Sequence, residues 1–106
     1  MSTPCPFFGE IPSDHRSDWG EALARALGAA LDKLRPSGTT GSIAKTRRGS
    51  LLIVVTSGDG EHQIEIDCLG DAAEVRGEGE TKAFGHNWIP ELVEHVMQRV
   101  SRWHER

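Results

Sequence analysis

The run Leu51–Val55 constrains the fold of this chain more than any other stretch, because it is the only run of five consecutive apolar residues. Glycine-bearing segments bound it, Arg48–Ser50 before it and Gly58–Gly60 after it. A short apolar run of this kind, rich in β-branched residues, is typical of a strand buried in a sheet. We therefore predict that residues 51–56 form the central strand of an antiparallel sheet.

An amphipathic helix is predicted on each side of this region. The first runs from about Ser17 to Leu34, because its apolar residues recur at three- and four-residue steps and so align on one side of a helix. The second begins at Asn87 or Trp88 and ends at Trp103, with Pro90 in the first turn, where proline is tolerated. Its apolar stripe consists of Ile89, Leu92, Val93, Val96, Met97, Val100 and Trp103.

Four strands are predicted between the two helices, at about residues 42–47, 51–56, 62–69 and 72–76. The connections between them are short and contain glycine, as hairpins require, so neighbouring strands should be antiparallel. The segment Gly77–Gly85 is polar and contains several glycines, and we interpret it as a loop.

Two turns select the same inner face for this sheet. A turn at Gly70–Asp71 places Ile66 opposite Val75, and a turn at Asp59–Gly60 places Ile53 opposite Ile66. A slip of one residue would reverse both faces, so the apolar pattern favours this register. The register of the first strand depends on the length of the turn that follows it, and stays open.

These elements predict an α+β fold, a two-layer sandwich of order α-β-β-β-β-α with both helices on one face of a four-stranded antiparallel meander. Residues 14–106 would form a single domain, and residues 1–13 a proline-containing N-terminal tail. Phe7, Phe8 and Ile11 of this tail could cover the core or could contact a partner.

Composition excludes several classes of function. The chain has 106 residues and a formal net charge of −4, whereas nucleic-acid binding needs an excess of Lys and Arg, so nucleic acid and anionic membrane surfaces are not expected partners. No stretch approaches the ~18 apolar residues of a membrane span, and the first residues lack the features of a signal peptide. We expect a cytoplasmic protein.

No known catalytic, metal or cofactor motif occurs in the chain. The five histidines and two cysteines, Cys5 and Cys68, show no zinc-ligand spacing, and the glycines match no phosphate-binding loop. Cys68 is interpreted as a small buried residue and Cys5 as part of the tail. The sequence therefore predicts no cofactor, no metal and no catalytic residue, and it favours a protein without enzymatic activity.

The outer face of the predicted sheet carries the candidate site. Leu52 and Val54 point there, although a solvated face should be polar. Asp67 lies directly opposite Glu74, and this unfavourable pair suggests a face that receives a cationic group. The candidate partner-binding residues are Leu52, Val54, Glu65, Asp67, Glu74, Ile43 and Lys45.

The order of elements, with the Trp19 helix, the meander and the sequence Trp88-Ile89-Pro90-Glu91-Leu92 opening the last helix, resembles short uncharacterised proteobacterial α/β proteins of unknown function. This resemblance implies no activity and assigns no functional residue.

Two kinds of function follow as hypotheses. The first is a protein-interaction module (an adaptor, an immunity-type inhibitor or a chaperone-like binder) whose outer sheet face binds a protein partner or a second copy of the chain. The alternative is a small-ligand binder or enzyme with a site around residues 77–88, near His86 and Asn87. The basic hairpin at Lys45, Arg47 and Arg48 protects a sheet edge or, as a third reading, contacts nucleic acid.

Overall fold

The computed structural model describes residues 3–5, 7–11, 18–34, 38–69, 72–77, 79–85 and 89–103, and the statements below concern these residues. The elements in chain order are β1 (Thr3–Cys5), β2 (Gly9–Ile11), α1 (Asp18–Leu34), β3 (Thr40–Lys45), β4 (Leu51–Thr56), β5 (Gln63–Leu69), β6 (Ala72–Gly77), β7 (Glu80–Phe84) and α2 (Ile89–Trp103).

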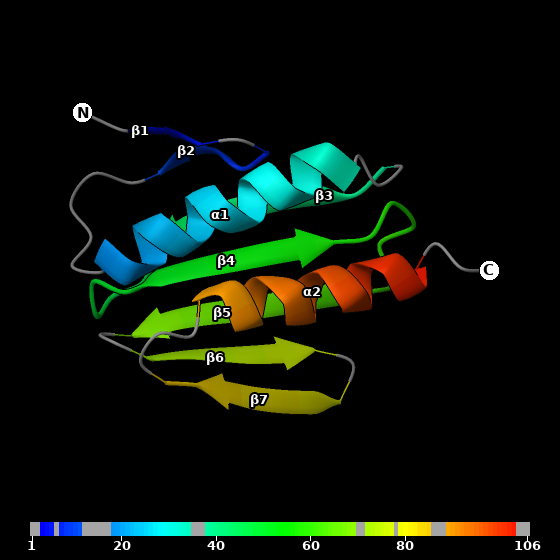
Figure 1. Ribbon diagram of the computed structural model, residues 1–106. Coiled ribbons are helices and arrows are strands. Elements are labelled where there is room, and N and C mark those ends of the chain that lie inside the picture. The colour runs from blue at the N-terminus through cyan, green and yellow to red at the C-terminus, as the bar shows by residue number, and fades with distance from the viewer. Residues whose placement is uncertain are drawn as a thin grey trace.

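Strands β3 to β7 form one antiparallel sheet in sequence order, and both helices lie on the same face of it (Figure 1). The predicted α+β class, the meander and the common side of the helices are confirmed. The prediction of four strands is wrong, because the sheet has five. The additional strand, β7, comes from the segment interpreted as a loop. Four of its five residues are exposed, and therefore its sequence lacks the apolar alternation that marks a buried strand.

The inner face of the sheet is the centre of the core. Leu51, Ile53 and Val55 of β4 are fully buried, whereas the residues between them are half-buried. Ile53 lies opposite Ile66 and Ile66 opposite Val75, so the predicted register of these strands is confirmed. The helices bury one stripe each against this face, made of Leu23, Leu27, Leu31, Leu92, Val96 and Val100.

Strand β3 has a different register from the one needed to place Ile43 and Lys45 on the outer face. The connection Thr46–Ser50 has five residues, closed by hydrogen bonds from Thr46 N to Ser50 O and from Gly49 N to Thr46 O, both 3.0 Å long. This length places Ile43 opposite Ile53, and Lys45 opposite Leu51. Both residues therefore share the parity of the inner face, since a shift of one residue reverses the faces of a strand.

The N-terminal segment adds to the core. Strands β1 and β2 pair as an antiparallel hairpin, so Cys5 belongs to a strand rather than to an irregular tail. Phe8 and Ile11 are buried with the core residues. The Phe8 ring lies so close to Gly41 of β3 that a Cβ atom there would be 2.4 Å from it. Gly41 shares the inner-face parity, so the hairpin covers the helix side of the edge strand β3 and not the outer face.

A close approach occurs where β6 ends. A Cβ atom at Gly77 would lie 2.4 Å from the carbonyl oxygen of Gln63, which is too close for any side chain. The Gly77 carbonyl accepts a hydrogen bond of 2.6 Å from Nη2 of Arg99, a residue of α2 that is only 3% exposed. Glycine at this position thus permits the close approach of β6 to β5, and its carbonyl group links β6 to α2.

We predict that Gly77→Ala lowers the free energy of unfolding by about 2 kcal/mol, because backbone atoms of β5 would have to move. Gly85→Ala is the matched control, since nothing lies within 4 Å of a Cβ atom there, and it should change stability by less than about 0.5 kcal/mol. Urea unfolding of both variants measures the difference. Equal effects would contradict the steric explanation.

His95 of α2 packs against β7. Its ring lies 5.7 Å from the ring of Phe84, and its buried Nε2 atom has no hydrogen-bond partner among the described residues. Burial lowers the pKa of His95, and positive charges nearby lower it further, while one carboxylate opposes them. In order of effect, these charged groups are Lys82, Arg99, Glu80 (which opposes the shift) and Arg102.

We predict that this histidine makes the protein less stable in mild acid. Because its pKa is lower in the folded chain than in the unfolded chain, the unfolded state binds more protons as the pH falls below about 6.5. The stability present above that pH is therefore lost below it. Unfolding free energies measured at pH 7.5 and 5.5 should fall more for the wild type than for His95→Gln. An identical decrease in both would refute this assignment.

Candidate interaction surface

The outer face of the sheet carries five of the seven predicted site residues. Leu52 and Val54 of β4 are half-buried there, and neither helix covers this side of the sheet (Figure 1). The register places Leu52 beside Asp67, Val54 beside Glu65, and Asp67 beside Glu74. The remaining two residues, Ile43 and Lys45, have the parity of the other face and do not belong to this surface.

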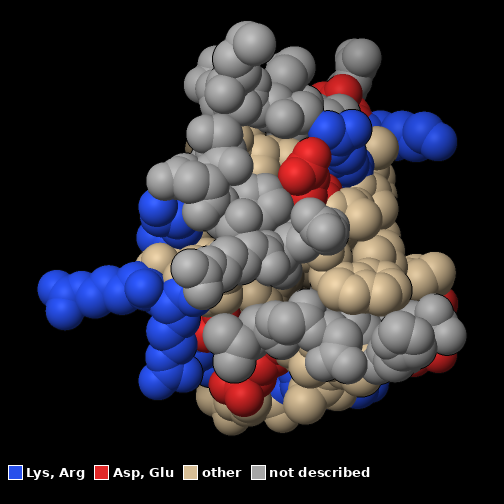
Figure 2. All heavy atoms as spheres, turned by 90° about the vertical axis from the view of Figure 1, so that its left-hand side faces the viewer, with Lys and Arg blue, Asp and Glu red and all other residues tan. Residues whose placement is uncertain are grey.

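Leu52 and Val54 form an apolar centre on the outer face, and small and polar residues flank it on the side of β3. Ala44 lies opposite Leu52 and Ser42 opposite Val54, and both are exposed. Because these side chains are short, Leu52 and Val54 remain accessible beyond them. Arg47 and Arg48 are exposed in the adjoining turn, and Lys and Arg side chains project from this end of the molecule (Figure 2).

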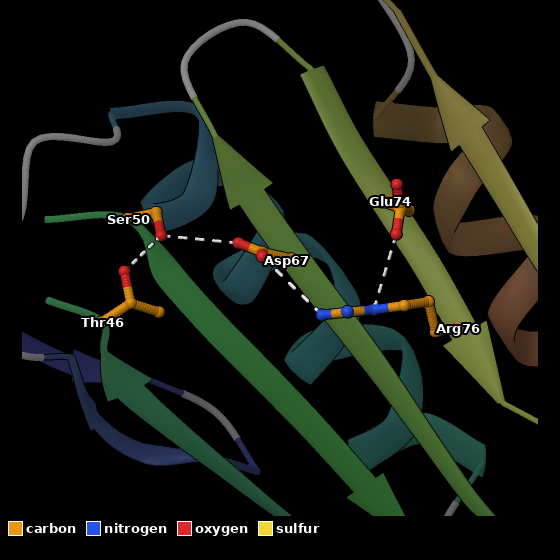
Figure 3. A network of polar contacts seen from close by, with 5 residues as sticks. All are labelled: Thr46, Ser50, Asp67, Glu74 and Arg76. Atoms are coloured by element: carbon orange, nitrogen blue, oxygen red, sulfur yellow. Dashed lines mark hydrogen bonds and ion pairs between the residues drawn. The ribbon is translucent and has the colours of Figure 1, made fainter. Parts of the chain in front are cut away.

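Arg76 is the residue that sequence reasoning missed. It lies opposite Glu65 in the register, but its guanidinium reaches between two other carboxylates (Figure 3). Nη2 is 3.7 Å from Oδ2 of Asp67, and Nε is 3.6 Å from Oε1 of Glu74. The prediction that the Asp67–Glu74 pair awaits an external cation is therefore wrong, because the chain supplies one. The register predicted from the sequence does place Arg76 on this face, opposite Glu65, but it does not show that the side chain reaches Asp67 and Glu74.

A line of hydroxyl groups extends this polar network to the β3–β4 turn. Ser50, only 5% exposed, donates a long hydrogen bond of 3.4 Å to Oδ1 of Asp67. Ser50 and Thr46 share a hydrogen bond of 2.5 Å, in which Thr46 is the donor because the Ser50 proton is already engaged. The network holds Asp67 from two sides and orders the polar border of the apolar centre.

Two shallow hollows lie at opposite ends of the outer face. One has a volume of about 290 Å³ and is lined by Arg48, Asp67, Ala72, Ala73, Glu74 and Ala83. The other has a volume of about 350 Å³ and is lined by Glu61, Gln63, Glu65, Arg76 and Gly77. The first is lined by charged residues and alanines and the second mainly by polar residues, and both are open to solvent. They therefore suit the side chains of a docked protein surface better than an enclosed small molecule.

The groups considered for chemistry lie elsewhere. Cys68 is buried on the inner face, and burial raises the pKa of its thiol to about 12, so this thiol is no nucleophile at neutral pH. The His62 ring stacks on Trp103 at 5.6 Å between ring centres. Within the described part of the chain, no group of three or more His, Cys, Asp or Glu residues could hold a metal ion.

The alternative site around residues 77–88 is only partly described. Strand β7 occupies residues 80–84, so most of the expected loop is a strand. His86 and Asn87 lie outside the described residues.

None of the described helices is long and apolar enough to cross a membrane.

Comparison with protein-family models, curated proteins and solved structures finds no match to this chain. A function must therefore be argued from the surface itself.

We predict that Arg76 stabilises the fold because its positive charge offsets the repulsion between the carboxylates of Asp67 and Glu74. Arg76→Gln should lower the free energy of unfolding by about 0.5–1 kcal/mol, and this loss should shrink at high salt. In a Glu74→Gln background the same substitution should cost less, because one of the two opposed charges is gone. A double-mutant cycle by urea unfolding measures the coupling. An equal loss in both backgrounds would show that the charge of Glu74 contributes nothing to the effect of Arg76.

Proposed function

We propose that this protein is a non-enzymatic interaction module, of the adaptor, immunity-inhibitor or chaperone-like kind, that binds a protein partner through the outer face of its sheet. The observation that carries the proposal is the position of Leu52 and Val54, which lie half-buried on β4, an interior strand of the sheet, on a face that neither described helix covers. An apolar centre with a polar border is the usual composition of a protein-binding surface.

The charges around this centre indicate what kind of partner fits. Arg47 and Arg48 lie at the β3–β4 turn, and Glu65, Asp67 and Glu74 lie across β5 and β6. Arg76 already neutralises part of the acidic side through Asp67 and Glu74. The complementary partner therefore has an apolar centre as its main contact, with charged groups that select orientation more than they add affinity.

Rigidity supports the same proposal. The apolar residues lie on β4, which pairs with strands on both sides, and the acidic border is held by contacts between side chains. A surface built on paired strands is ordered before binding, so little conformational entropy is lost when a partner docks.

We predict that Leu52→Glu abolishes capture of a protein partner from a cytoplasmic lysate. Ala29→Glu is the matched control, because it adds the same charge at an exposed position of α1, in the helix layer. Circular dichroism must first show that both variants are folded. The captured protein, identified by mass spectrometry, is then purified and titrated against all three chains at two salt concentrations.

The expected result is that wild type and Ala29→Glu bind alike and that Leu52→Glu binds at least about tenfold more weakly, since a charge would be buried in the apolar centre. If the purified partner binds all three chains equally, the outer face is not its docking site. If no protein is captured at all, the proposed function fails.

A further inference from the structure

The two edges of the sheet differ. Next to β3, the β1–β2 hairpin packs on the helix side, with the rings of Phe7 and Phe8 over Gly41. Next to β7, no other described element lies along the outer edge (Figure 1). Four of the five β7 residues are exposed, and none is proline. An uncovered edge strand of this kind presents unpaired backbone groups to another strand.

The backbone groups that point away from the sheet follow from one hydrogen bond. Ser57 N donates to His62 O at 2.9 Å, so in β5 the even-numbered residues bond to β4, and Glu65 and Asp67 bond to β6. The described registers contain no bulge, and the alternation continues into the next pair of strands. In β7, Lys82 therefore bonds to Val75, whereas Thr81 and Ala83 point their N–H and C=O groups outward.

The charges of β7 favour one register in which another strand could pair with this edge. Glu80 and Lys82 flank Thr81 and share the helix-side face of the strand. If a second β7 pairs antiparallel with its centre at Thr81, Glu80 of each strand lies opposite Lys82 of the other. A centre at Lys82 would oppose two lysines, and the backbone groups of that residue already bond to β6. The direction of the free backbone groups and the placement of the charges thus both favour Thr81 as the centre of the pairing.

We propose that a second copy of this chain pairs with β7 in this antiparallel register, so that the two five-stranded sheets become continuous. The Glu80–Lys82 contacts would fall at non-hydrogen-bonded positions, where side chains of opposite strands approach most closely. Lysine on an edge strand usually discourages pairing, but here Glu80 supplies the opposite charge at the facing position. The proposal is independent of the outer face and would place two such faces side by side.

Charge exchange provides the sharpest test. In Glu80→Lys, lysine would face lysine across the dimer, and in Lys82→Glu, glutamate would face glutamate. Each variant alone should self-associate about tenfold more weakly than the wild type, measured by sedimentation equilibrium at low salt. An equimolar mixture of the two restores both opposite-charge contacts, so it should form a one-to-one complex with an affinity within about threefold of the wild type. The interface is small, and the measurement therefore needs high protein concentrations.

Thr81→Pro tests the backbone contacts separately. Proline removes an N–H group that points outward, and it leaves the hydrogen bonds between β6 and β7 in place, so the fold should persist. Thr81→Val keeps the N–H group and serves as the control. We expect Thr81→Pro to be monomeric and Thr81→Val to associate like the wild type, both with native circular dichroism.

Other results would overturn the proposal. A wild type that stays monomeric at high concentration, or charge variants that associate as it does, would exclude pairing through β7. A dimer that is lost in Leu52→Glu but kept in Thr81→Pro would place self-association on the outer face. A dimer unaffected by Leu52→Glu, with no captured partner, would leave the edge proposal intact while the proposed function fails.

Discussion

Burial of the inner face of β4 is the constraint on which the rest of the structure depends. Leu51, Ile53 and Val55 have no exposed surface, and the helix stripes are buried on the same side of the sheet. Since alternate residues of a strand point to opposite faces, this burial assigns every other residue of β4 to the outer face. Leu52 and Val54 are therefore on the outer side because their neighbours are in the core, and the candidate surface is a consequence of how the core forms.

The polar contacts on the outer face show how a sheet manages charges that its register brings together. Asp67 and Glu74 must be neighbours, because the pairing of Ile66 with Val75 leaves no other arrangement. Arg76 is long enough to reach past its own cross-strand partner and lie between them. Exposed ion pairs of this kind contribute little to stability, but they define which part of the face is polar. The apolar centre of the face, Leu52 and Val54 of β4, is covered by neither helix, and the proposed function rests on these two residues.

The two edge strands of the sheet, β3 and β7, differ in how other elements pack against them. On one side, Phe8 and Ile11 extend the core beyond α1 and cover the helix side of β3. On the other side, His95 of α2 packs against Phe84 of β7, and no described element lies along the outer edge of that strand. The Lys82 amine lies 5.2 Å from the centre of the Phe84 ring, on the helix side of the strand. Among the described residues, no strand pairs with the outer edge of β7, and the charged side chains of Glu80 and Lys82 lie on the helix side of the sheet.

The sequence by itself determined both helices, the strands β4 to β6 and their register, because burial imposes a period of two on strands and of about 3.6 on helices. It also predicted Leu52 and Val54 on the outer face for the same reason. Only the tertiary structure decided the rest. Strand β7 buries one residue and so carries no period, and the face of Ile43 depends on a five-residue turn. The place of Arg76 depends on the reach of a side chain across strands, which no local pattern records.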